Sequence, residues 1–117
     1  MEIKINNNTY KIFFVNSNSE KLQMEDGEFH SGIIDFTKKE IYIADDLNQD
    51  TLRYTLIHEL THAVIDSYGF LQVEWNDEII ADFMANYIPN IADFLNKIEE
   101  KSKADFLNKI EEKSKKE

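Results

Sequence analysis

Two histidines, His58 and His62, stand four residues apart in the segment LIHELTHAV at residues 56–64. On a helix, residues at this spacing share a face, so both imidazoles can be directed at one metal ion. Glu59 is turned about 100° from His58, where its carboxylate can reach a water on the metal rather than the metal itself. The three residues predict a zinc site in which Glu59 is the general base, taking a proton from water that attacks a carbonyl group.

A catalytic zinc ion held by two imidazoles still lacks one protein ligand. Glu78 and Asp82 are candidates because they lie four apart, in a second expected helix. We assign Glu78 as the third ligand, since its side chain is one methylene longer. Asp82 is then the outer carboxylate that accepts a histidine N–H, or the alternative ligand. Asp66 and His30 rank below these two.

These residues also have a plain structural explanation. Histidines four apart can be solvated side chains on an ordinary helix, and acids are favoured near any helix amino terminus. The metal site is preferred because the motif lies on an amphipathic helix, expected from about Asp50 to Tyr68 and ended by Gly69. The residues expected on its apolar side are Leu52, Leu56, Ile57, Leu60, Ala63 and Val64, and those expected on the opposite side are Thr55, His58, Glu59, His62 and Asp66.

The first 45 residues read as three or four short antiparallel strands, with polar turn residues between the apolar runs. The last two runs are separated by residues 37–39, which suits a hairpin that leads directly into the motif helix. A second helix is expected to open at Asn76 or Asp77 and to break or kink at Pro89, and Asn90 can cap a third. The strand-like runs are EIKI, TYKIFFV, GIIDF and EIYIA.

The third expected helix contains an unchanged repeat, ADFLNKIEEKSK, at residues 92–103 and 104–115. A step of twelve residues rotates a helix by about 120°, so the apolar residues of the two copies cannot share one face. We therefore divide the chain into a domain at 1–90 and a helical tail at 91–117, in which one copy packs. The other copy is dispensable, or serves as an amphipathic helix that binds a partner.

Composition restricts the classes of function. The 117 residues include 23 acidic and 13 basic side chains, and the net charge of −10 argues against nucleic-acid or membrane-surface binding. With no cysteine, any metal must be held by His, Asp, Glu or water. The segment MEIKINNNTYK lacks the apolar run of a secretory signal, and no segment has the apolar length of a membrane span, so we expect a cytoplasmic protein.

The strand with an Ile-Asp step, the strand EIYIA, the helix TLIHELTHAV and the following ADFMA together resemble the ImmA/IrrE family of small zinc metallopeptidases, especially its short phage and mobile-element forms. The resemblance covers roughly residues 32–88. The sequence departs from the family at Ile80, because the residue before the first alanine of ADFMA is often acidic in the family. This departure leaves the third ligand open between Glu78 and Asp82. The spacing of these two acids is also similar to that in thermolysin-like peptidases.

The resemblance implies a minimal zincin-like α+β fold, with a small antiparallel sheet, an HExxH helix and two further helices. It also implies Zn²⁺ and the cleavage of a protein substrate, for example a repressor of a mobile element. An exposed strand of the hairpin could pair with an extended substrate. The alternative is a protein without activity: a zinc-stabilised module that binds a protein as an antirepressor does, or an inactive relative of the peptidases. The oligomeric state is left open.

Overall fold

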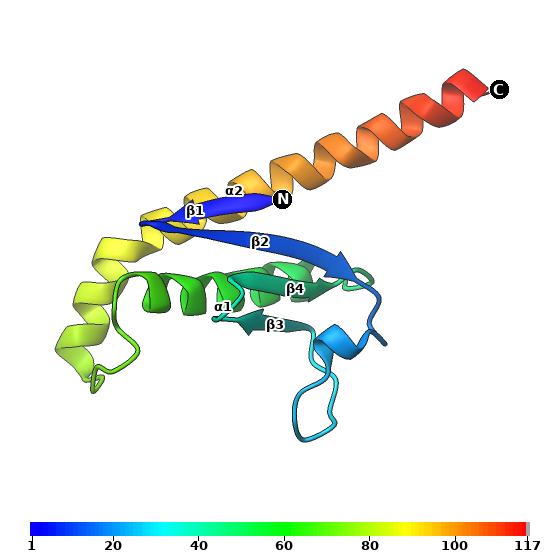
Figure 1. Ribbon diagram of the computed structural model, residues 1–117. Helices are drawn as coiled ribbons and strands as arrows, with labels where there is room; N and C mark the ends of the chain where they lie inside the picture. The colour runs from blue at the N-terminus through cyan, green and yellow to red at the C-terminus, as the bar shows by residue number, and fades with distance from the viewer. Residues whose placement is uncertain (117) are drawn as a thin grey trace.

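The computed structural model describes the backbone of residues 1–116 and the side chains of residues 1–104 (Figure 1). It is an α+β fold with four strands, a short 3-10 helix and two α-helices. In chain order the elements are β1 (Glu2–Ile5), β2 (Asn8–Val15), η1 (Glu20–Leu22), β3 (Gly32–Asp35), β4 (Glu40–Ala44), α1 (Gln49–Ser67) and α2 (Asp77–Lys116).

The four strands form one mixed sheet in the order β1-β2-β4-β3. The predicted hairpin of β3 and β4 is confirmed, with Asp35 opposite Glu40. The expectation of an antiparallel sheet is wrong for one pair, because β2 and β4 run parallel. A parallel pair needs a long crossover, and the segment with η1 and β3 provides it. After this crossover and β3, the chain re-enters the sheet as β4, between β2 and β3. The apolar run Ile41–Ala44 is therefore buried.

The main core lies between one face of the sheet and the two helices. The opposite face carries a smaller cluster in which Leu22 of η1 meets Tyr42 and Ala44 of β4. A sheet covered on one face by helices is the expected solution for strands that alternate buried and exposed residues. The main core consists of Ile3, Ile5, Tyr10, Ile12, Ile41, Ile43, Leu56, Leu60, Ala63, Val64, Phe83, Ile91, Leu95 and Ile98.

Helix α1 has the predicted extent, and Asn48 caps it by accepting a hydrogen bond from the Thr51 backbone N–H at 2.9 Å. Its predicted division into two sides needs correction at three positions. Ile57 is 42% exposed, whereas Thr55 and Glu59 are buried. The reason is tertiary, because strand β3 packs along the side of the helix that carries Thr55 and Glu59. It covers side chains that helical periodicity alone places outside the core.

Helix α2 begins after Asn76, whose side chain accepts the Ile79 backbone N–H at 3.0 Å, and continues past Pro89. A break at Pro89 and a separate third helix are therefore wrong, and of the two predicted effects of Pro89 only the kink is compatible with the continuous helix. Proline removes one helical hydrogen bond and crowds the preceding turn. Here, buried side chains on both sides of Pro89, among them Phe83 and Ile91, keep one apolar face on the core. Figure 1 shows α2 changing direction in its first part, as proline kinks do.

The first repeat copy contributes Leu95 and Ile98 to the core. Beyond Ala104, the side chains of the second copy lie outside the described residues. The predicted dispensability of this copy therefore stays a prediction, as does the division of the chain at residue 90. The molecule measures 58 × 34 × 26 Å. Figure 1 shows the carboxyl-terminal part of α2 extending beyond the sheet. None of the helices, over the residues that the structure describes, is long and apolar enough to cross a membrane.

Candidate functional site

The two motif histidines converge on the surface of α1. His58 is exposed and His62 is half-buried, and their Nε2 atoms are 3.2 Å apart. Two nitrogens bound tetrahedrally to zinc, each at about 2.0–2.1 Å, would be about 3.3 Å apart. The same separation suits an N–H···N hydrogen bond between two neutral rings, so the geometry fits a metal ion without requiring one. The pair has the separation that a shared zinc ion needs.

The electrostatic setting of His62 favours its metal-binding form. Burial lowers the pKa of His62, and the charge of His58 lowers it further. A lower pKa keeps the imidazole neutral at neutral pH, and only the neutral ring has a lone pair for a metal.

The carboxyl group of Glu59 is the buried member of the motif. Its residue is 6% exposed, and the described part of the chain offers it no hydrogen-bond partner. Burial raises its pKa to about 7, while the charge of His30 acts in the opposite direction. A carboxyl group with this pKa can both accept and return a proton near neutral pH, as a general base requires.

Gly32, at the start of β3, lets the strand lie close to this part of α1. A Cβ atom at residue 32 would be 2.6 Å from Thr55 Cγ2 and 3.1 Å from Glu59 Cγ. The first contact is shorter than real Cβ atoms show and the second is tighter than most, so glycine permits the close approach of the two elements. The approach buries Glu59, and Ser31 Oγ fastens the same end of the strand to Thr55 Oγ1 at 3.0 Å.

Two hollows flank the histidines. The first, about 360 Å³ in volume, lies between α1 and β3, and Glu59 and His30 line it. The second, about 310 Å³, lies along the outer side of α1 and is lined by apolar groups of Tyr54, Ile57 and Ile65. Both hollows include His58 and His62, so groups bound on either side of the pair would meet at the same point.

The structure does not bring the predicted third ligand to this pair. Glu78 and Asp82 are exposed on α2 and line neither hollow. Asp66 is engaged elsewhere, because it accepts hydrogen bonds from Tyr10 Oη at 2.5 Å and Lys39 Nζ at 2.6 Å. Burial alone would raise the pKa of Asp66, but these two bonds hold it below the ordinary value.

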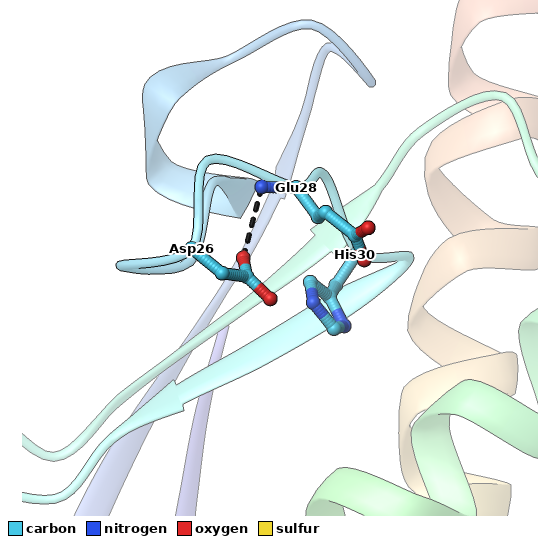
Figure 2. A group of neighbouring side chains, drawn as sticks. All are labelled: Asp26, Glu28 and His30. Atoms are coloured by element: carbon cyan, nitrogen blue, oxygen red, sulfur yellow. Dashed lines mark hydrogen bonds between the residues drawn. The ribbon is translucent and has the colours of Figure 1, made fainter.

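One group of three potential metal ligands within residues 1–104 has all its donor atoms within 4.8 Å of one another. It consists of Asp26, Glu28 and His30, in the loop before β3 (Figure 2). His30 ranked low among the ligands predicted from the sequence, and neither acid was predicted. Their alternate spacing in the run DGEFH is that of one face of a strand, but the segment lies in a loop, so the fold of the loop is what brings the three side chains together.

Comparisons with protein-family models, with curated proteins and with solved structures find no match to this chain.

Proposed function

We propose that the protein is a zinc-dependent metallopeptidase that cleaves a protein substrate, of the small kind that the ImmA/IrrE resemblance implies. The observation that carries the proposal is the 3.2 Å separation of the Nε2 atoms of His58 and His62, beside a buried carboxyl group. His58 and His62 are the metal ligands in this proposal, and Glu59 is the general base. The third ligand, for which the sequence favours Glu78 over Asp82, is a separate question.

The chemistry divides between the metal and Glu59. A zinc ion held by the histidines would polarise the substrate carbonyl and lower the pKa of water. Glu59, whose pKa of about 7 is suited to proton transfer, would take the proton from the attacking water and pass it to the leaving amine. The 360 Å³ hollow, which Glu59 lines, leaves room for a peptide group beside the histidines.

The position of β3 supports a peptide substrate. This strand is at the edge of the sheet, paired on one side with β4, and it borders the hollow through Gly32, Ile33 and Ile34. An extended peptide can pair with the free side of an edge strand through main-chain hydrogen bonds. Such pairing would hold the backbone of the substrate close to the histidines and suits an endopeptidase.

A second candidate function is a zinc-stabilised binding module without activity, such as an antirepressor or an inactive relative of the peptidases. One observation favours it: Glu78, the expected third ligand, lies outside both hollows. The two functions differ in their need for Glu59, because binding needs no proton acceptor.

The test is cleavage of a library of peptides derived from a bacterial proteome, with products identified by mass spectrometry. The zinc-loaded protein should cleave a subset of the peptides. Glu59→Gln should retain the metal and the fold but lose at least about 100-fold in rate, because an amide cannot accept the proton. Equal cleavage by the variant would exclude Glu59 as the base. Absence of cleavage by the unaltered, zinc-loaded protein would favour the binding module.

A further inference from the structure

We propose that His30 is the third protein ligand of the metal site, and that Asp26 and Glu28 orient its imidazole ring. The inference rests on the proposed function, because it concerns the same metal ion. It replaces an acid from α2 with a histidine from the loop before β3.

His30 borders the site on the side opposite α1. It lines the 360 Å³ hollow together with His58, Glu59 and His62. It also lines a smaller hollow of about 180 Å³ with His58, Glu59 and Tyr54. Glu59, nine-tenths buried and without a hydrogen-bond partner among the described residues, lines both spaces. His30 is thus the potential ligand outside α1 that shares these hollows with the motif.

The backbone on both sides of His30 is fixed. The His30 N–H donates to Leu22 O at 2.9 Å, and Leu22 is fully buried. The next residue, Ser31, bonds Thr55 of α1 through its hydroxyl group and accepts the Ala44 N–H at 2.9 Å through its carbonyl group. A backbone held in this way keeps His30 beside the motif, so only the rotation of its side chain has to be fixed on metal binding.

Two carboxyl groups surround the His30 ring. The donor atoms of Asp26, Glu28 and His30 all lie within 4.8 Å of one another. Asp26 Oδ1 also accepts the Glu28 backbone N–H at 2.9 Å, and Figure 2 shows the carboxyl groups of both acids turned towards the His30 side chain. A metal-binding histidine usually donates its second ring N–H to a carboxylate, which fixes the orientation of the ring. Asp26 and Glu28 are placed to accept that N–H.

Coordination requires the His30 side chain to rotate. Its nitrogens do not form, with those of His58 and His62, a group within 4.8 Å, since the described residues contain one such group and it is the loop trio. The His30 side chain is exposed, so rotation about its two side-chain bonds is not restricted by packing. The resulting set of three histidines and one open position is a known arrangement for catalytic zinc.

Zinc titration against a competing chelator tests this assignment without any substrate. We expect one high-affinity site in the unaltered protein. His30→Ala should weaken it by more than about 100-fold, beyond the usual cost of losing an outer carboxylate, and Asp26→Asn with Glu28→Gln should weaken it by about 10-fold to 100-fold. Glu25→Gln, on the same loop but outside the trio, is the matched control and should leave the affinity unchanged. X-ray absorption should count three imidazole ligands, and two in His30→Ala.

Three outcomes would overturn the assignment. If His30→Ala binds zinc as the unaltered protein does, while Glu78→Ala does not, the third ligand is on α2 and the proposed function stands. If the protein binds two ions, and His58→Ala loses one while His30→Ala loses the other, the loop trio is a separate site. If the unaltered protein binds no zinc, the proposed function fails together with this inference. Circular dichroism of each variant verifies the fold.

Discussion

The carboxyl group of Glu59 lies between α1 and β3, and burial raises its pKa from 4.5 to about 7. A group whose pKa is higher in the folded state than in the unfolded chain stabilises the fold when it is protonated. For the metal-free protein, the free energy of unfolding should therefore fall as the pH rises from about 4.5 through about 7. The expected loss from this one residue is roughly 1–3 kcal/mol.

Urea denaturation at pH 5 and pH 8, in the presence of a chelator, measures this loss. The control is Glu59→Gln, which resembles the protonated side chain and cannot ionise. The variant should lose less stability than the unaltered protein between the two pH values. An equal loss of stability in both proteins would show that the burial of Glu59 does not cause the pH dependence of the free energy of unfolding.

Gly32 sets the distance between the site and the edge strand. In Gly32→Ala the new Cβ atom would meet Thr55 Cγ2 at 2.6 Å, so either β3 or the Thr55 side chain must move. We expect a loss of about 1–3 kcal/mol in the free energy of unfolding, typical of overpacking. Thr55→Ser removes that methyl group, so the double variant should recover part of the loss. If the two losses simply add, the close contact is not the cause.

At the scale of elements, local patterns predicted α1, the hairpin and the start of α2 correctly. The Asn48 and Asn76 caps lie within a few residues of the groups they bond, so a short window of sequence contains the information. The parallel pairing of β2 and β4 depends on residues far apart in the chain and has no local pattern. The separate third helix after Pro89 was wrongly predicted for a related reason: the core that holds α2 together across Pro89 forms only in the folded molecule.

The duplicated segment offers a matched test of which repeat copy packs. Ile98 and Ile110 occupy the same place in two identical sequences, and Ile98 is 1% exposed in the core. Ile98→Ala should cost about 2–5 kcal/mol in the free energy of unfolding. Ile110→Ala should cost less than about 0.5 kcal/mol, as substitutions outside a core do, because a twelve-residue step turns it off the packing face. Equal losses from chemical denaturation would contradict the predicted role of the tail.

At the scale of the whole molecule, the site combines a segment that the sequence reveals with one that it hides. His58, Glu59 and His62 are within one helix, so their spacing alone predicts their convergence. The loop of His30 meets them only because β3 packs along α1. The burial of Glu59 follows from the same packing. The convergence of the two histidines was therefore predictable from the sequence, whereas the burial that raises the pKa of Glu59 and the approach of the His30 loop were not.

The zinc content of the purified protein after dialysis, measured by mass spectrometry of the metal, tests the proposed metal site without any substrate. We expect close to one zinc ion per chain, lost in both His58→Ala and His62→Ala and retained in Glu59→Gln. This expectation follows because the Nε2 atoms of the two histidines, 3.2 Å apart, are placed to provide two of the bonds to the ion. A folded, unaltered protein that binds no zinc, or one whose zinc survives the loss of both histidines, would contradict it.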